Sequence, residues 1–140
     1  MTEFTQFVAQ HWLLFLALVA IIALIYQTET NAGQRHLFVS PVEATHKMNR
    51  EKAVVLDIRD NEAYGEGHVV NAINIPFADL DAQSDKLAKF KQKPIIIACF
   101  KGISAQKALK QLKKLGFENL AVLQGGMAAW EQAKLPTVKK

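Results

Sequence analysis

The chain has 140 residues, one cysteine and a formal net charge of +4. A single cysteine excludes a disulfide framework and a cysteine-rich zinc module, and the length allows one small globular domain. Because 14 of the 17 basic residues are lysines and no aromatic-interleaved basic tract accompanies them, the charge argues against nucleic-acid binding and favours anionic lipid or an anionic small molecule.

The N-terminal segment is apolar enough to enter a membrane. The run Trp12–Tyr26 contains 15 apolar residues without interruption, and the longer stretch Phe7–Tyr26 contains only Gln10 and His11 as polar residues. A transmembrane helix needs about 20 mainly apolar residues. Apolar side chains would cover every face of this helix, and one small domain can hardly enclose it on all sides. We therefore expect residues 7–26 to form a transmembrane helix in contact with the lipid bilayer.

The residues that flank this run favour an uncleaved anchor over a cleaved signal peptide. Neither Lys nor Arg precedes the run, and the polar residues after Tyr26 contain no small-residue cleavage site. The first basic residues on the C-terminal side are Arg35, Lys47 and Arg50. The positive-inside rule then predicts that the C-terminal domain faces the cytoplasm.

Two regions follow from this interpretation. Residues 1–36 are expected to hold the anchor and a short polar tether, with the tether formed by residues 27–36, which show no hydrophobic periodicity. Residues 37–140 are expected to form the globular domain.

Helix and strand signals alternate through this domain. Ser40-Pro41-Val42-Glu43 has the spacing of a capping box, with proline at the first helical position, and predicts a short helix that ends before Asn49. The later segments with helical signals are Asp60–Tyr64, Ser84–Phe90, Ala105–Leu115 and Met127–Ala133. The segments with strand signals are Ala53–Leu56, Ala72–Ile75, Ile95–Ala98 and Leu120–Leu123. This alternation predicts an α/β fold with a parallel sheet.

The residues with the strongest chemical signals follow the predicted strands. In open parallel sheets, ligands bind outside the carboxyl ends of the strands. Asp57, Cys99 and the turn Gln124-Gly125-Gly126 stand at those ends. Cys99 is the strongest candidate, because a short glycine-containing loop leads from it directly into the next predicted helix.

The loop after Cys99 has the features of an anion cradle. Successive backbone N–H groups in such a loop can surround an anion, and the N-terminus of the following helix adds partial positive charge. Lys101 contributes a full charge. These features favour the thiolate of Cys99 over the thiol, and we expect a sulfur atom that is open to solvent within a ring of amides.

A cysteine phosphatase is disfavoured by one position in this loop. Such enzymes carry an arginine six residues after the nucleophile, where this chain has Ala105. The planar guanidinium that would hold a phosphoryl dianion is therefore missing.

Motifs in a fixed order from about Val39 to Pro136 resemble a single rhodanese homology domain. They are Val55–Arg59, Glu62–Tyr64, Gly67-His68, Ala72–Pro76, Cys99–Ser104, Leu115–Asn119, Gly125–Trp130 and Leu135-Pro136. Together with the anchor, the chain is similar to membrane-tethered single-domain rhodaneses of the bacterial inner membrane. The resemblance implies a rhodanese-like three-layer α/β/α sandwich with a parallel sheet of about five strands, preceded by one transmembrane helix.

The resemblance also implies a sulfurtransferase of the thiosulfate type. Cys99 would take sulfane sulfur from a small anionic donor such as thiosulfate, become a persulfide, and pass the sulfur to cyanide or a thiol. The substrate-binding loop would comprise Phe100, Lys101, Gly102, Ile103 and Ser104. We expect no cofactor and no metal, since His68 lacks further ligands at a suitable spacing.

Several of these residues also have structural interpretations. Asp57 and Arg59 are expected to orient loops through an ion pair, and His68 is expected to be a satisfied hydrogen-bonding residue in a supporting role. A second hypothesis treats the domain as a membrane-tethered interaction module, catalytically weak or inactive, that recruits a protein partner, such as a membrane protein. Phe100 and Ile103 favour this alternative, because apolar loop tips suit contact better than anion capture.

Overall fold

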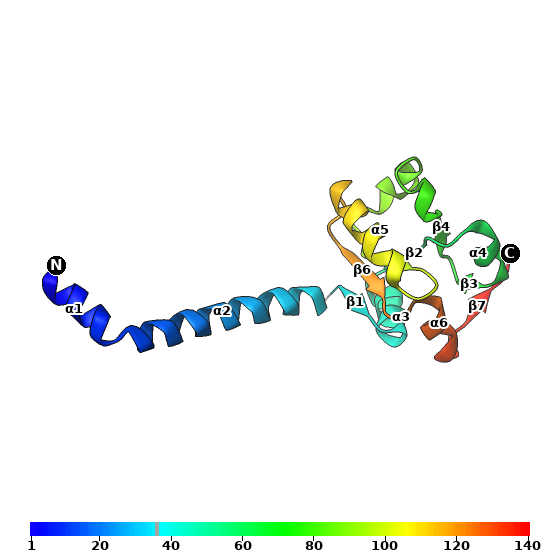
Figure 1. Cartoon of the computed structure of the whole chain (residues 1–140). Coiled ribbons are helices and arrows are strands. Elements are labelled where there is room, and N and C mark those ends of the chain that lie inside the picture. The colour runs from blue at the N-terminus through cyan, green and yellow to red at the C-terminus, as the bar shows by residue number, and fades with distance from the viewer. Residues whose placement is uncertain (36) are drawn as a thin grey trace. The chain divides into compact units, whose positions relative to one another are not determined.

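The computed structural model describes residues 1–35 and 37–140, except for the side chains of residues 29–35. The chain divides into two compact units, Met1–His36 and Leu37–Lys140. Each unit has its own architecture (Figure 1).

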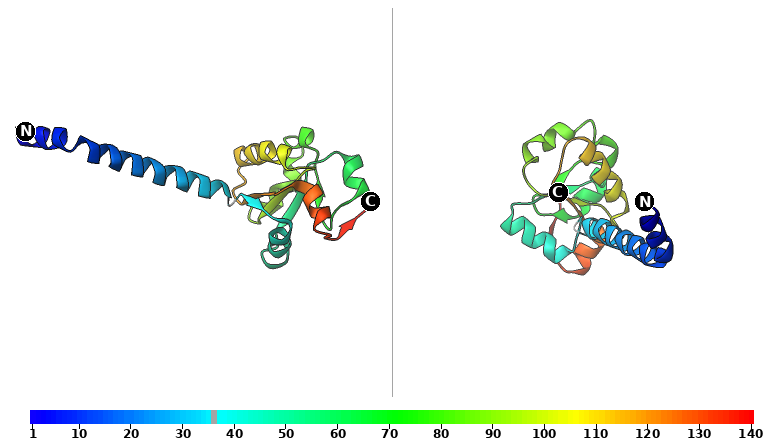
Figure 2. Two further views of the ribbon diagram at one scale, coloured as in Figure 1. Left: turned by 60° about the horizontal axis from the view of Figure 1, so that its bottom comes forward. Right: turned by 90° about the vertical axis from the view of Figure 1, so that its left-hand side faces the viewer.

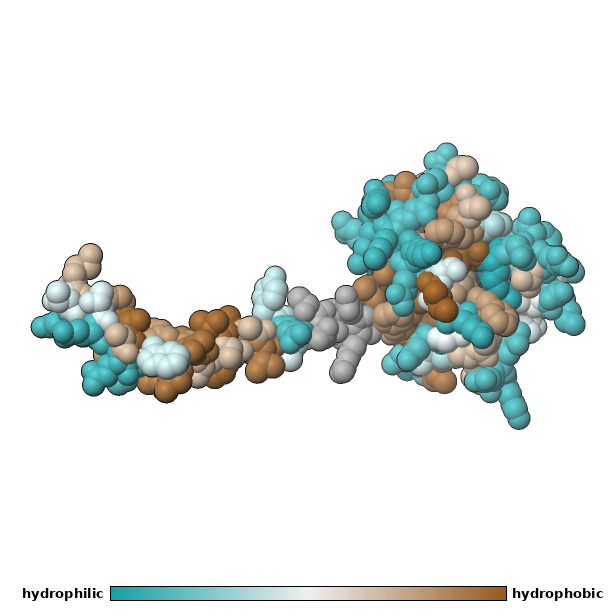
Figure 3. Space-filling model, in the orientation of Figure 1, coloured by the Kyte–Doolittle hydropathy of each residue, from teal (hydrophilic) through white to brown (hydrophobic). Residues whose placement is uncertain are grey.

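The first unit consists of two helices, α1 (Thr2–Gln10) and α2 (Trp12–Arg35). The expectation of one unbroken helix over residues 7–26 is wrong, because the helix breaks at His11 and its two parts form an angle of 72° (Figure 1). Among the described residues, no helix taken alone has both the length and the hydropathy of a membrane span, whereas α1 and the part of α2 up to Thr28 reach them together. Apolar side chains cover most of the visible surface in the first part of α2 (Figure 3).

The expected polar tether is helical in the described residues. The helix α2 continues to Arg35, while the last residue of the predicted tether, His36, lies outside the residues that the structure describes. The apolar run ends at Tyr26 but the helix does not, because no proline follows before Arg35 and a single glycine, Gly33, is tolerated within a helix.

A parallel sheet of five strands forms the centre of the second unit and confirms the expected α/β fold. Its strands are β1 (Phe38–Val39), β2 (Val54–Asp57), β4 (Ile73–Asn74), β5 (Ile95–Ala98) and β6 (Leu120–Leu123). They lie in the order β1-β6-β5-β2-β4, so the continuously apolar β5 occupies the middle. A separate antiparallel pair joins β3 (His68–Val69) to β7 (Thr137–Val138).

The helices follow the predicted positions with small changes. The helical segments are α3 (Pro41–Arg50), α4 (Asn61–Glu66), α5 (Ile103–Lys114), α6 (Gly126–Gln132) and the 3₁₀ segments η1 (Phe77–Asp79) and η2 (Ser84–Phe90). The predicted capping box forms, because the Ser40 hydroxyl accepts from the Glu43 N–H and the Glu43 carboxylate accepts from the Ser40 N–H. Asp60 caps α4 in a similar way, through the N–H of Ala63.

Alternate residues of the sheet enter two apolar cores and create three layers. Ile95 and Ile97 of β5 belong to the core that includes Leu112 of α5. Ile96 belongs to the core on the opposite face, which includes Trp130 of α6. Thus α5 and η2 cover one face of the sheet, and α3 and α6 cover the other (Figure 2). Because β2, β5 and β6 are parallel, their carboxyl ends lie at the same end of the sheet, between these two helical layers.

Candidate active site

Cys99 follows the last residue of β5, and the loop Cys99–Gly102 connects this central strand to α5. The neighbouring strand β2 ends at Asp57, whose register partner on β5 is Ala98. The strand β6 ends at Leu123, next to the turn Gln124–Gly125. The fold therefore brings the three predicted strand-end features to the same edge of the sheet.

The loop is held in place by the N-terminus of α6. The N–H of Met127 donates to the carbonyl oxygen of Cys99 at 2.7 Å, and the N–H of Ala128 donates to the carbonyl oxygen of Phe100 at 3.2 Å. Gly126, with φ +62°, makes this close approach feasible. A Cβ at Gly126 would overlap the carbonyl oxygen of Cys99 and would lie 2.6 Å from that of Phe100. The Gly-Gly doublet thus provides close packing against the loop in addition to the turn predicted from the sequence.

The backbone of Gly102 contacts the sulfur of Cys99 directly. Its N–H donates to Cys99 Sγ at 2.7 Å, and its φ of +89° folds the loop back over the sulfur. Within the part of the chain that the structure describes, the N–H groups of Lys101, Ile103 and Ser104 have no backbone acceptor, as expected at the start of a helix. One amide of the predicted ring therefore reaches the sulfur, and three more stand near it in sequence without a backbone partner.

The expectation that Cys99 is open to solvent is wrong. The residue is only 5% exposed and belongs to the same apolar core as Ile58 and Ala105. The physical reason is the left-handed Gly102, which turns the loop inward and places the sulfur against the first turn of α5. A strand-to-helix loop can be identified from sequence, but the direction in which it closes depends on backbone angles that a glycine leaves open.

The side chains of Phe100 and Lys101 in the loop, and of Ile103 and Ser104 in the first turn of α5, point away from this core. Phe100 is 63% exposed and Ile103 is 73% exposed, while Lys101 and Ser104 are also exposed. The ammonium group of Lys101 lies 5.9 Å from the centre of the Phe100 ring. The loop therefore presents two apolar side chains and one cation to the surroundings of the domain.

Asp57 and Arg59 form a buried ion pair. Asp57 is fully buried, and the guanidinium of Arg59 holds both of its carboxylate oxygens, with the shortest contact at 2.7 Å. The same guanidinium donates to the carbonyl oxygen of Gly67 at 2.7 Å. Asn74 bridges the backbone carbonyls of Asp57 and Arg59. This arrangement fixes the segment after β2 to the segment before β3.

His68 lies in a second buried group. Its Nδ1 is 2.7 Å from the carbonyl oxygen of Tyr64, and the two rings stack with their centres 3.7 Å apart. The Tyr64 hydroxyl donates to the carbonyl oxygen of Ala72. Burial, and secondarily the negative charge of Asp57, raise the pKa of Tyr64, so this hydroxyl stays protonated at neutral pH. Among the described residues, neither His68, Asp57 nor Arg59 hydrogen-bonds to the side chain of Cys99.

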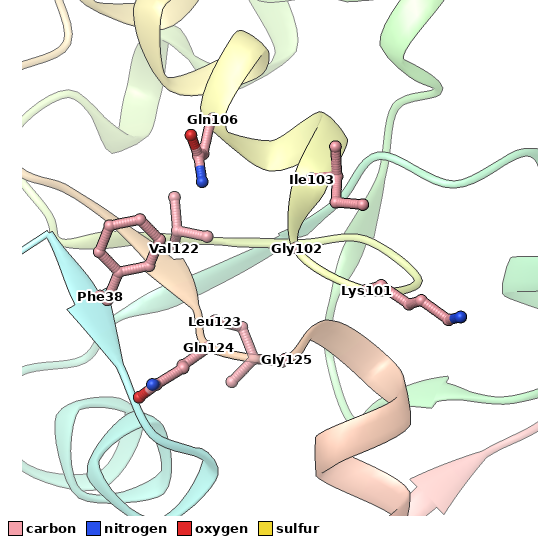
Figure 4. A pocket seen from close by; sticks show the side chains of 9 residues that line it. All are labelled: Phe38, Lys101, Gly102, Ile103, Gln106, Val122, Leu123, Gln124 and Gly125. Carbon is pink, nitrogen blue, oxygen red and sulfur yellow. The ribbon is translucent and has the colours of Figure 1, made fainter.

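A cavity of about 350 Å³ adjoins the outer side of the loop (Figure 4). It is lined by Lys101, Gly102, Ile103, Gln106, Phe38 and the segment 122–125, and Cys99 does not line it. The side chain of Lys101 points away from Phe38 and Gln106 (Figure 4). Sequence reasoning missed Phe38 and Gln106, because no strand was predicted at β1 and because Gln106 lies outside every recognised motif.

Comparisons with known proteins agree with this geometry. Residues 40–133 match the family described as the rhodanese-like domain. A protein of Escherichia coli K12 named "Uncharacterized protein YibN" is 33% identical over 141 residues, which is 99% of this chain and 99% of the relative. "Thiosulfate sulfurtransferase GlpE" of Coxiella burnetii is 33% identical over 66% of this chain and 85% of its own length.

A solved structure shares the fold of the second unit. The crystal structure of the full-length protein from Lactobacillus plantarum matches with a TM-score of 0.70 and 24% identity, over 82% of this chain and 98% of that protein. This likeness concerns the fold alone. With the match over residues 40–133 and the cysteine loop in its place after the central strand, the chain belongs to the rhodanese-like domain family.

Proposed function

We propose that the protein transfers sulfane sulfur through a persulfide on Cys99. The observation that carries the proposal is the contact of 2.7 Å between the Gly102 N–H and Cys99 Sγ. An N–H donor stabilises negative charge on sulfur, both in the attacking thiolate and in the persulfide that follows. The name of the Coxiella relative, a thiosulfate sulfurtransferase, supports the same class of reaction.

The proposed reaction has two steps. The Cys99 thiolate attacks the outer sulfur of thiosulfate, the sulfur–sulfur bond of thiosulfate breaks, and sulfite leaves with the electron pair. The outer sulfur of the resulting persulfide is then attacked by cyanide or by a thiolate, which releases thiocyanate or a new persulfide and restores the Cys99 thiolate. The chain has one cysteine, so the acceptor is a separate molecule.

The burial of Cys99 restricts the reactants. A sulfur atom on a residue that is 5% exposed admits a small anion more readily than a bulky donor. Lys101 supplies positive charge on the same loop, which favours the approach of a dianion such as thiosulfate.

Intact mass spectrometry tests this reaction. After incubation with thiosulfate, the wild-type protein should gain the mass of one sulfur atom, and cyanide should remove it with formation of thiocyanate. The Cys99→Ser variant should gain nothing. A wild-type mass that stays unmodified with several sulfane sulfur donors would contradict the proposal.

We further infer that the first unit anchors the protein at the bacterial inner membrane, with the second unit on the cytoplasmic side. The apolar run Trp12–Tyr26, and the length and composition of the bent helix pair, support this attachment. The similarity to the E. coli relative extends over 99% of the chain and so includes the helices of the first unit. The full-length protein should remain in the membrane fraction after an alkaline wash and leave it only with detergent.

A second function is favoured by the exposed apolar tips of the loop. Phe100 and Ile103 are largely exposed, whereas the sulfur of Cys99 is buried, as suits a loop that recognises another protein. In that case a partner protein would co-purify with the Cys99→Ser variant as it does with the wild type. The same partner would be lost with the Phe100→Asp variant.

A further inference from the structure

We propose that the bend at His11 lies at the membrane–water interface, so that α1 lies along the interface and α2 alone enters the hydrocarbon. The proposal rests on the membrane attachment proposed above, and it is independent of the reaction at Cys99. Three observations on the described residues lead to it: the distribution of side chains on α1, the backbone hydrogen bonds at the bend, and the direction of the bend.

The helix α1 has one apolar face and one polar face. Phe4, Phe7 and Val8 share a side of the helix at the spacing of three and four residues. The opposite side carries polar residues, namely Thr2, Glu3, Gln6 and Gln10. In contrast, apolar residues surround the axis of α2 through its first four turns. A helix with separate faces suits the plane of the interface, whereas one that is apolar on all sides suits the hydrocarbon.

The backbone at the bend requires water. The His11 carbonyl accepts from the N–H groups of Leu14 and Phe15, so α2 starts a new set of hydrogen bonds there. In the described residues, the N–H groups of Trp12 and Leu13 have no acceptor. Unpaired backbone groups are strongly unfavourable in hydrocarbon, but water and lipid headgroups can satisfy them at the interface. The bend therefore belongs at the membrane surface.

The direction of the bend places the apolar face of α1 toward the lipid. A hollow of about 150 Å³ inside the angle between the helices is lined by Phe7 of α1, by His11 at the bend, and by Leu14, Phe15 and Leu18 of α2. The rings of Phe7 and His11 lie with their centres 4.7 Å apart on this inner side. If α2 enters the membrane from the bend, the same inner side of α1 faces the hydrocarbon.

The length of the apolar run within α2 is consistent with a thinned bilayer around the anchor. The apolar run Trp12–Tyr26 extends over about 22 Å at about 1.5 Å per residue, compared with a hydrocarbon thickness of about 30 Å. A short apolar helix is accommodated by local thinning of the bilayer and by interfacial residues at its ends. Trp12 and Tyr26 are aromatic residues of the kind that prefers this position.

A cysteine scan of the full-length chain in the Cys99→Ser background tests the arrangement. Single substitutions Phe4→Cys and Val8→Cys probe the apolar face of α1, Thr2→Cys and Gln6→Cys probe its polar face, and Leu16→Cys and Ile21→Cys probe α2. Each variant is reconstituted into vesicles of phosphatidylethanolamine and phosphatidylglycerol. The rate of labelling by a membrane-impermeant maleimide is then measured from both sides of the membrane, in separate samples.

The proposal expects a helical pattern of labelling in α1. Position 4 and position 8 should react about tenfold more slowly than position 2 and position 6, because only the polar face meets water. Both positions in α2 should be protected. Uniform protection along α1 would place the bend inside the hydrocarbon, and uniform labelling would place α1 in water, so either result would overturn the proposal.

The controls separate this arrangement from the other proposals. Labelling of Leu16→Cys and Ile21→Cys would refute the membrane attachment itself, and this proposal with it. Sulfur transfer to Cys99 is measured on the wild-type chain in the same vesicles, and its absence would refute the sulfurtransferase proposal without affecting the pattern in α1.

Discussion

Met127 holds Cys99 through the backbone: its N–H donates to the Cys99 carbonyl oxygen at 2.7 Å. The helix α6, which begins at Gly126, therefore determines the conformation of a loop that lies between β5 and α5. A residue outside the loop thus helps to fix the backbone of the residue that carries the thiol.

Replacement of Gly126 by alanine should disrupt the loop. The new Cβ would overlap the Cys99 carbonyl, and alanine at φ +62° is itself strained. We expect a destabilisation of at least about 2 kcal/mol, because the left-handed conformation costs roughly 1–2 kcal/mol and overpacking adds a similar amount. Denaturant unfolding measures this loss, and intact mass measures the accompanying loss of persulfide formation. Gly65→Ala is the matched control, since its Cβ would meet no atom within 4 Å, and an equal effect there would contradict the argument.

Replacement of Gly102 by alanine should affect reactivity more than stability. The nearest atom to the new Cβ would be the Leu123 carbonyl oxygen at 3.6 Å, so only the strain at φ +89° remains, about 1–2 kcal/mol. Relief of that strain moves the Gly102 N–H away from Cys99 Sγ. The rate of persulfide formation should fall in protein that is still folded by circular dichroism. An unchanged rate would show that this N–H does not stabilise the sulfur anion.

Loss of the Arg59 side chain should destabilise the domain strongly. Arg59→Ala leaves the fully buried Asp57 carboxylate without its cation, and breaking such a pair costs about 3–5 kcal/mol. The stability of Arg59→Lys should lie between that of the wild type and that of Arg59→Ala, because lysine keeps the charge but lacks the planar guanidinium. Urea unfolding measures the free energy of unfolding of the three proteins. Lys47→Ala removes an exposed ion pair with Glu51 and should lower the free energy of unfolding by less than about 1 kcal/mol. Equal losses of stability in Arg59→Ala and Lys47→Ala would contradict the stronger role of the buried pair.

The capping box of α3 should make stability depend on acid pH. The backbone N–H of Ser40, and secondarily its side chain, lower the pKa of Glu43 below its ordinary value of 4.5. The folded state then binds this proton less readily than the unfolded state, so the contribution of the Glu43 charge is complete above the unfolded pKa. The contribution is lost as pH falls through the lower folded pKa. Wild type should therefore exceed Glu43→Gln in stability at neutral pH, and the difference should vanish in acid. If the stability difference between wild type and Glu43→Gln stays the same in acid, it does not come from the charge of Glu43.

The central part of the fold could be predicted because its signals are local. Ile95–Ala98 and Leu120–Leu123 have the predicted bounds, since continuous apolar runs of this kind indicate strands buried on both faces. Ser40 and Glu43 likewise mark the start of α3 by their spacing. In contrast, the two-residue strands β1, β3 and β7 carry no such signal, because their partners define them.

The details of the site depend on contacts that are distant in sequence. The loop from Cys99 to Ser104 could be identified as a strand-to-helix connection, but the burial of its sulfur follows from the left-handed angle of Gly102. The contact between Gly126 and the Cys99 carbonyl depends on how two connections meet at one edge of the sheet. The break at His11 depends on backbone geometry within a run of helix-forming residues, and hydropathy does not detect it.

The dependence of the cysteine loop on α6 imposes an order on synthesis. A ribosome releases Cys99 well before Gly126, Met127 and Ala128, whose backbone secures the loop. Until those residues have left the exit tunnel, the loop lacks the two hydrogen bonds that the backbone of α6 donates to the carbonyl oxygens of Cys99 and Phe100. The conformation of the cysteine loop is therefore completed only after the chain beyond β6 has been made.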